Sequence, residues 1–315
     1  MTNQFLVCDL SWRSSVKFAL GETGEGPGPV TTYDCDSRDA FADRLRLFLG
    51  EHDNPALRGA ALSARGWEEN GIMQAVGEDV AISRHEIRDL LGIQRVNVVN
   101  NFVARALAVP TLRRNERVRI SGEDAADETV IAVLGPHYGL GAAALVSDGA
   151  GGWTALPGEG GHSDLAARTE RECEVLGALM AEHGYASRET ALSLTGVTNL
   201  WNALHTIDGE MAPVLAPMDI LALAKQGDAR AAEVSRLISA WLGAFASDLA
   251  LVLGARGGVY LTGALIDLMG DDFDTATFVE RFHDKGPRTG YVQEIPVYRT
   301  QTNNLELKGL ATLFD

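Results

Sequence analysis

Cysteine is scarce in this chain of 315 residues. The three cysteines, Cys8, Cys35 and Cys173, are odd in number and far apart, and no Cys-x-x-Cys pair occurs. This pattern excludes a disulfide framework and the usual spacing of a structural zinc site. The sequence therefore predicts free thiols, no metal site, and a location in the reducing cytoplasm.

Basic residues and long apolar runs are also few. Lys and Arg number 27 against 43 Asp and Glu, so the net charge is −16, which argues against nucleic acid or an anionic membrane as a partner. Residues 1–10 lack the basic start of a signal peptide. The apolar stretch Trp241–Leu261 is interrupted by Asp248 and Arg256, and it is predicted to be a buried helix followed by a strand.

What remains is the composition of a folded protein, with 46% hydrophobic and 22% charged residues. The length suits one large domain or two smaller ones. Two β-hairpins are predicted from short apolar runs, the first over Gln4–Asp9 and Val16–Leu20, the second over Thr129–Leu134 and Ala142–Val146. Because helical patterns follow each hairpin, we expect the α/β class with two lobes.

The remaining elements are predicted from apolar spacing and from capping residues. Ser83 and Glu86 have the spacing of a capping box, and Asp228 suits the first position before a long helix. The expected strands are Gly59–Leu62, Val96–Val99 and Gly258–Thr262, and the expected helices are Ala40–Phe48, Ser83–Leu91, Asn101–Ala108, Glu170–Glu182, Arg188–Ser193, Val197–Leu204, Asp228–Val252 and Leu305–Leu313. The acidic segment Glu123–Glu128 is expected to be a solvated loop.

The segment Leu156–Asp164 reads Leu-Pro-Gly-Glu-Gly-Gly-His-Ser-Asp. Its glycines let the backbone approach a ligand closely, and the turn presents Glu159 and His162 three residues apart. A carboxylate and an imidazole on one rigid loop can bind several sugar hydroxyls by charge-assisted hydrogen bonds. The alternative is a glycine-rich turn with two exposed polar side chains.

This segment resembles the sugar-binding signature of the bacterial glucokinases, which are relatives of the hexokinases. Further collinear matches extend over nearly the whole chain: Val99–Ala104, Gly135–Gly141, Glu189, Leu192–Leu200, Gly257–Leu265 and Phe282–Gly286. The chain is therefore identified as a divergent member of that family.

The resemblance implies a two-lobed, actin-like ATPase (ribonuclease H-like) fold and ATP-dependent phosphorylation of the glucose 6-hydroxyl with magnesium. It implies a small α/β domain of residues 1–110 and 303–315, a large helix-rich domain of residues 111–302, and a homodimer. By position, the sugar contacts would be Asn100, Asn101, Glu159, His162 and Glu189. The nucleotide and phosphate contacts would be Asp9, Gly139, Gly141 and Gly263.

One departure from the family pattern affects the chemistry directly. Asn101 stands where the family places the aspartate that accepts the proton of the hydroxyl. An amide can hold that hydroxyl by a hydrogen bond, but it cannot accept the proton. Rescue by another acid stays open, and Asp164 is the nearest to the sugar signature in the sequence.

The phosphate-binding segments depart from the pattern too. In the first phosphate turn, Asp9 to Ser15, the paired glycines are lost, one residue is inserted and Trp12 is bulky, although Asp9 remains and Arg13 could contact a phosphate or simply face solvent. In the second turn, Tyr138 is expected to fill the space of the γ-phosphate. Glu306, with Lys308 nearby, is expected to bring a negative charge near the nucleotide.

These departures favour a protein that binds glucose or a related hexose and has weak or lost kinase activity. One alternative is an active ATP-dependent glucokinase in glycolysis. Another is an interaction protein with an empty pocket, which predicts no stabilisation by any sugar.

Overall fold

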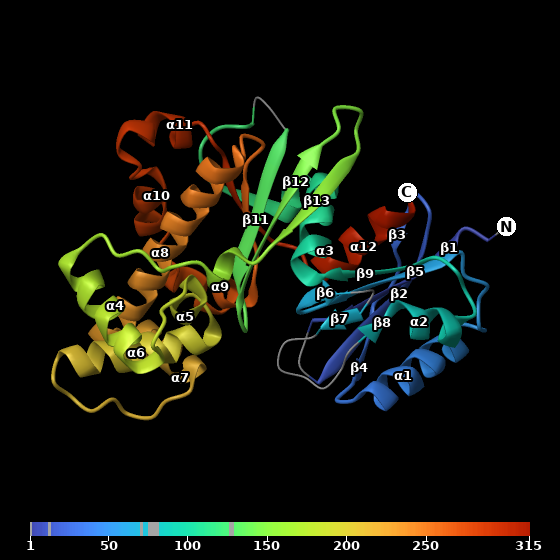
Figure 1. Cartoon of the computed structure of the whole chain (residues 1–315), viewed down its shortest axis with the longest axis horizontal. Coiled ribbons are helices and arrows are strands. Elements are labelled where there is room, and N and C mark those ends of the chain that lie inside the picture. The colour runs from blue at the N-terminus through green and yellow to red at the C-terminus, as the bar shows by residue number, and fades with distance from the viewer. Residues whose placement is uncertain (1, 12–13, 70–71, 75–81, 126–128) are drawn as a thin grey trace. The chain divides into compact units, whose positions relative to one another are not determined.

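The computed structural model describes residues 2–11, 14–69, 72–74, 82–125 and 129–315. The chain forms two compact units. Unit 1 comprises Met1–Arg113 and Thr302–Asp315, and unit 2 comprises Arg114–Gln301. Figure 1 shows each unit as a β-sheet covered by helices.

Unit 1 is built on a sheet in the order β3-β2-β1-β5-β9, with β4 also paired to β2. Strands β1 and β2 form the predicted antiparallel hairpin, and β1, β5 and β9 run parallel. The strand bounds are β1 Gln4–Leu10, β2 Ser15–Glu22, β3 Gly26–Pro27, β4 Thr31–Asp34, β5 Gly59–Ala64 and β9 Val96–Asn100. A small separate sheet consists of β6 Trp67–Glu69, β7 Ile72–Gln74 and β8 Ile82–Ser83.

Helices cover both faces of the main sheet of unit 1. Because side chains alternate along a strand, Leu6 and Cys8 join one core with α1 Arg38–Glu51 and α2 Arg84–Leu91. Phe5 and Val7 join a second core with α3 Asn101–Ala108 and α12 Leu305–Ala311. Helices α3 and α12 pack together, so the last residues of the chain complete the first unit (Figure 1). Short 3-10 turns follow these two helices, at Val109–Thr111 and Thr312–Phe314.

Helix α2 begins as predicted but is capped differently. The Ser83 hydroxyl accepts a hydrogen bond from the N–H of His85, 3.2 Å away. The Glu86 side chain forms an ion pair with Arg38. The capping box predicted from Ser83 and Glu86 is therefore wrong, because Glu86 has a partner on α1.

Unit 2 is built on a sheet in the order β10-β15-β14-β11-β12-β13. The second predicted hairpin is confirmed as the antiparallel pair β11 and β12, with Gly135 opposite Gly141. Strands β11, β14 and β15 run parallel. The bounds are β10 Arg117–Ser121, β11 Val130–Pro136, β12 Leu140–Ser147, β13 Trp153–Gly158, β14 Val259–Leu261 and β15 Val297–Thr300.

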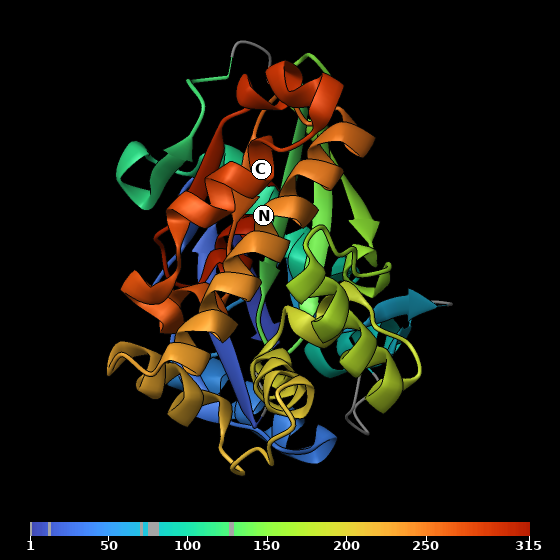
Figure 2. The same cartoon turned by 90° about the vertical axis from the view of Figure 1, so that its left-hand side faces the viewer.

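The helices of unit 2 share one large core with its sheet. The long helix α8 Ala229–Leu253 lies along α10 Thr275–His283 (Figure 2). It is capped, as predicted, by Asp228, whose carboxylate accepts from the N–H groups of Arg230 and Ala231. The other helices are α4 Glu170–His183, α5 Arg188–Ala191, α6 Leu194–Ile207, α7 Pro217–Lys225, α9 Ala264–Met269, α10 Thr275–His283 and α11 Thr289–Gln293. Short 3-10 turns occur at Arg114–Glu116, Gly160–His162, Gly270–Asp272 and Gly286–Arg288.

Helix α8 is long and apolar enough to cross a membrane by length and composition alone. However, 61% of its most apolar window is buried inside the protein, as in the core helix of a folded domain. Its side chains Leu237, Trp241 and Phe245 belong to the core of unit 2. This agrees with the predicted buried helix in Trp241–Leu261, which strand β14 then follows.

Candidate functional site

The junction between β9 and α3 carries two of the predicted sugar contacts. Asn100 caps α3, because its side-chain oxygen accepts from the N–H of Phe102 at 2.7 Å. Its amide nitrogen donates to the carbonyl of Gly66 at 2.6 Å. Asn101 is the first residue of α3 and is buried, with 8% of its surface exposed. Two hydrogen bonds thus fix the backbone that carries Asn101.

Asp9 lies near the end of β1 and is fully buried. One carboxylate oxygen accepts from the N–H of Ser11 at 3.0 Å and from the hydroxyls of Ser11 and Ser63, the latter at 2.8 Å. Among the described residues, the other oxygen, Oδ2, has no hydrogen-bond partner. Burial, and next the negative charge of Glu306, raise the pKa of Asp9 to about 6, although its serine hydrogen bonds act to lower it. An acid with one oxygen left over suits a magnesium-bound water.

The raised pKa of Asp9 predicts a specific pH dependence of stability. An acid whose pKa is about 6 in the folded state and near its ordinary 3.8 in the unfolded state binds more protons when folded. Its contribution to stability is therefore lost as pH rises from about 4 to about 6. We expect Asp9→Asn to lose less stability over this interval than the wild type, measured by urea unfolding at pH 4, 5, 6 and 7. Parallel curves for the two proteins would contradict the assignment.

Trp12 and Arg13, which mark the altered first phosphate turn, lie outside the described residues. The expectation that they disturb phosphate binding therefore remains a prediction. So does the suggested contact of Arg13 with a phosphate.

Glu306 has an ion-pair partner that was not predicted from the sequence. It is buried in unit 1, and its carboxylate oxygen Oε1 lies 2.6 Å from Nη2 and 2.8 Å from Nε of Arg105 on α3. Burial acts to raise the pKa of Glu306, but the Arg105 guanidinium, a backbone hydrogen bond and the charge of Lys17 together lower it below its ordinary value. The charge of Glu306 is therefore paired with Arg105 inside the unit, and the expected negative charge near the nucleotide remains a prediction. An arginine in the otherwise apolar segment Asn101–Ala108 was the available sequence signal for this pair.

The turn between β11 and β12 is closed by its own backbone. The N–H of His137 donates to the carbonyl of Gly139 at 2.7 Å, and the N–H of Leu194 donates to the carbonyl of His137 at 2.9 Å. The His137 ring is buried and meets the Tyr138 ring edge-on, with centroids 4.6 Å apart. A phosphate-binding turn offers its backbone N–H groups to the ligand. In this turn, the N–H of His137 is already bonded to the carbonyl of Gly139. The proposed filling of the γ-phosphate space by Tyr138 remains a prediction.

Glu189 on α5 contacts the same turn. Its Oε2 accepts from the N–H of Leu140 at 2.7 Å. A methyl group built on Gly139 would lie 2.5 Å from this oxygen, so only glycine admits the carboxylate at this distance. The structure thus places the predicted sugar-binding glutamate directly against the predicted phosphate turn.

The other two sugar contacts of unit 2 follow β13. This strand extends through Gly158, so the glycine-rich turn is shorter than predicted and consists of Glu159 and the 3-10 turn Gly160–His162. Both Glu159 and His162 are exposed, and Nε2 of His162 lies 4.0 Å from Oε2 of Glu189. The structure therefore brings His162 and Glu189 together, with Glu159 on the same turn. A carboxylate beside an imidazole can bind neighbouring hydroxyl groups of a polyol.

The two remaining glycines of the predicted nucleotide site have structural roles of their own. Gly263 follows β14 with φ +126°, and a methyl group built on it would lie 2.3 Å from the carbonyl oxygen of Pro136. Gly141 lies in β12. Close packing alone accounts for glycine at two of the predicted positions, Gly139 and Gly263. Contact with a nucleotide remains a prediction for all four residues, Asp9, Gly139, Gly141 and Gly263.

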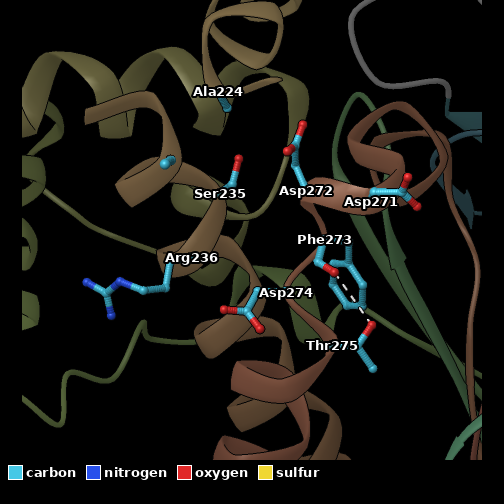
Figure 3. A pocket seen from close by; sticks show the side chains of 9 residues that line it. Ala224, Ser235, Arg236, Asp271, Asp272, Phe273, Asp274 and Thr275 are labelled. Carbon is cyan, nitrogen blue, oxygen red and sulfur yellow. Dashed lines mark hydrogen bonds between the residues drawn. The ribbon is translucent and has the colours of Figure 1, made fainter. Parts of the chain in front are cut away.

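Two cavities lie away from all these residues. One of about 600 Å³, lined by Ala224, Ser235, Arg236 and Asp271–Thr275 among others, is in unit 2. Figure 3 shows that the carboxylates of Asp271, Asp272 and Asp274 point in different directions and do not converge. The second, of about 460 Å³, lies between Arg46–Leu57 and Leu90–Ile93 in unit 1. Within the described ranges, no three His, Cys, Asp or Glu side chains are grouped to hold a metal ion.

Comparisons with known proteins define first the class and then the family. The fold is that of the actin-like ATPases, in the form found in sugar kinases. A glucokinase structure from an Antarctic psychrotroph matches with a TM-score of 0.88 and 29% identity, covering 100% of this chain and 99% of that one. A glucokinase from Balamuthia mandrillaris in complex with glucose matches with a TM-score of 0.82 and 17% identity, covering 99% and 93%, which supports the fold alone.

The sequence comparisons identify the family. The glucokinase family model matches residues 14–315. A glucokinase-like protein of Caulobacter vibrioides is 36% identical, with 94% of this chain and 92% of that protein covered. A glucokinase of Chromobacterium violaceum is 35% identical, with 95% and 86% covered. The chain therefore belongs to the glucokinase family.

Proposed function

We propose that this protein binds glucose or a closely related hexose and transfers phosphate to it weakly or not at all. The observation that carries the proposal is Asn101, a buried amide at the start of α3, which by the resemblance of Val99–Ala104 stands where the family places its proton-accepting aspartate. An asparagine can orient a hydroxyl, but it cannot take its proton. A positioned general base contributes about 10²- to 10⁴-fold to such a reaction.

The sugar contacts support the binding half of the proposal. His162 and Glu189 lie 4.0 Å apart, and Glu159 is on the same short turn as His162. We propose that these three side chains contact hydroxyl groups of the hexose, and that Asn100 and Asn101 are sugar contacts as well, as the family resemblance implies. Glu189 holds the N–H of Leu140 with the oxygen that lies nearest His162, so its other oxygen is left for a hydroxyl.

The nucleotide half of the proposal concerns Mg-ATP. Asp9 fits a magnesium-bound water, because its Oδ2 has no hydrogen-bond partner within the described part of the chain. Magnesium would neutralise phosphate charge there. Two features disfavour ATP binding. The turn at His137–Gly139 is closed by its own hydrogen bond, and the Tyr138 side chain is bulky. We propose that ATP binds weakly, and that the protein works in the cytoplasm as a homodimer.

A second candidate function is an active ATP-dependent glucokinase. Two observations favour it: the relatives at 35% and 34% identity that carry the name glucokinase, and the retained buried acid at Asp9. In that case another group, such as Asp164, must accept the hydroxyl proton. Asp164 lies between β13, which ends at Gly158, and α4, which begins at Glu170, and it is exposed.

Thermal-shift titrations test ligand binding. We expect glucose to raise the melting temperature in a saturable manner, because a ligand that binds only the folded state stabilises it by about 2.7 kcal/mol at 100 times its Kd. We expect Mg-ATP alone to give a much smaller shift. The double variant His162→Ala with Glu189→Gln removes two of the proposed sugar contacts, and it should abolish the shift of the melting temperature by glucose. No shift with any hexose would overturn the proposal in favour of an interaction protein, and an equal shift with Mg-ATP would favour the active kinase.

A further inference from the structure

Helix α8 carries one acidic side chain, Asp248, in its otherwise apolar second half. The Asp248 carboxylate bridges two cations. Its Oδ2 accepts from Nη2 of Arg188 at 2.8 Å, and its Oδ1 contacts the ammonium group of Lys285. The Lys285 side chain is only 7% exposed and the Arg188 side chain 15%. Charges this buried need partners in good geometry, so the three groups hold each other in place.

Arg188 joins this cluster to the sugar-binding turn. Its backbone N–H donates to the carbonyl of Ser163 at 2.9 Å, and its Nε donates to the carbonyl of Asp164 at 3.2 Å. Its guanidinium carbon lies 4.5 Å from the centre of the Phe245 ring. A methyl group built on Gly160 would lie 3.3 Å from that same ring, so the Phe245 ring packs closely against the turn at Gly160. Arg188 thus fixes the segment that contains His162.

Arg188 also precedes Glu189 directly on α5. This helix has only four residues, and a capping box between Ser187 and Thr190 fixes its first turn. When Asp248 holds the Arg188 side chain, the backbone at Glu189 is held as well. One oxygen of the Glu189 carboxylate, Oε2, then both accepts from the N–H of Leu140 and lies 4.0 Å from Nε2 of His162.

We propose that Asp248, acting through Arg188 and supported by Lys285, is a positioning group that sets the distance between Glu189 and His162 and thereby the hexose affinity. The inference rests on the proposed hexose binding and adds residues to that site. Asp248 touches no residue assigned to the hexose, so its effect passes through Arg188. Neutralising it leaves Arg188 and Lys285 without their shared anion, so the Arg188 side chain holds the carbonyl of Asp164 less firmly against α5, and the backbone hydrogen bond from Arg188 to Ser163 remains.

Asp208 offers a matched control. Its carboxylate also bridges two cations in unit 2, Arg171 at 3.0 Å and Arg230 at 2.8 Å. Its side chain is 31% exposed, against 34% for Asp248. Asp208 lies after α6 and bonds neither α5 nor the sugar-binding turn in the described residues. Asp208→Asn therefore removes a doubly paired carboxylate without reaching the site, while Arg171 keeps Glu233 and Arg230 keeps Glu210 as partners.

The experiment measures the Kd for glucose by calorimetry and, on the same proteins, backbone hydrogen exchange. We expect Asp248→Asn to weaken glucose binding about 10-fold, the effect of losing one charge-assisted hydrogen bond, and Asp208→Asn to change it less than about 2-fold. In a Glu189→Gln background, the effect of Asp248→Asn should shrink to about 2-fold or less, because coupled residues are not additive. A full 10-fold effect in that background would overturn the positioning role.

If the wild type binds no glucose, the proposed function is refuted. Hydrogen exchange then still tests the positioning role of Asp248. The positioning role still predicts that Asp248→Asn accelerates exchange about 10-fold at the N–H groups of Leu140 and Arg188, and that Asp208→Asn does not. Unchanged exchange at both amides in Asp248→Asn would overturn the inference whatever the wild type binds.

Discussion

Asn101→Asp is expected to raise the turnover of glucose with Mg-ATP by about 10²- to 10⁴-fold, the usual contribution of a positioned general base. The substitution changes one nitrogen to an oxygen at a buried position that begins α3, so it creates a carboxylate without changing the shape of the site. A coupled assay of ADP release, with glucose saturating, measures kcat for both proteins. The rise should appear in kcat rather than in KM for glucose, because proton removal occurs only in the transition state.

Asn100→Asp is the control for this gain of activity. It makes the same chemical change one residue earlier and preserves the cap of α3, since aspartate caps helices as well as asparagine does, but it gives up the hydrogen bond from the Asn100 amide to Gly66. We expect no increase in kcat from it. If Asn101→Asp is no faster than the wild type, a missing base is not what limits the chemistry. If Asn100→Asp gives an equal increase, the added charge and not its position is responsible.

The second large effect concerns stability. We expect Arg105→Met to destabilise the protein by about 3–5 kcal/mol, because it strands the buried Glu306 carboxylate without its partner. The double variant Arg105→Met with Glu306→Leu should recover most of that loss, since apolar side chains of similar volume often replace a buried ion pair at little cost. Urea unfolding followed by circular dichroism measures both.

The pair Arg46 and Asp43 on α1 provides the exposed comparison, with side chains 63% and 73% exposed. Removing it with Asp43→Asn should change the unfolding free energy by less than about 1 kcal/mol. Equal losses from the buried and the exposed pair would show that burial of Arg105 and Glu306 has no energetic consequence. An unrecovered loss in the double variant would show that the ion pair itself, and not the stranded charge, is needed.

Local patterns were enough to predict much of the fold. Apolar spacing and helix-capping residues, which are local features of the sequence, predicted both hairpins, the cap at Asp228 and the long helix α8. Strands β10, β13 and β15 were missed. Two of them, β10 and β13, have mostly exposed or half-buried side chains and carry no run of apolar residues. Their place is set by pairing with neighbouring strands, which sequence spacing does not show.

The site was predicted by motif, but its contacts were not. Resemblance named Glu189 and His162 as members of one pocket, and the structure brings them within 4.0 Å. The hydrogen bond from Leu140 to Glu189 joins residues 49 positions apart, and the pair of Arg105 and Glu306 joins residues 201 apart. Only the packing of distant segments makes such pairs. For this reason the sequence showed the negative charge of Glu306 but not its partner, Arg105.

The most direct test of the central claim is the turnover of the wild-type protein with saturating glucose and Mg-ATP, followed by release of ADP. A protein that binds hexose but lacks its proton acceptor should turn over at least about 10²-fold below the ordinary range of roughly 1 to 10³ per second. It should still be stabilised by glucose. Turnover within the ordinary range would contradict the account and identify this member of the glucokinase family as an active kinase with another base.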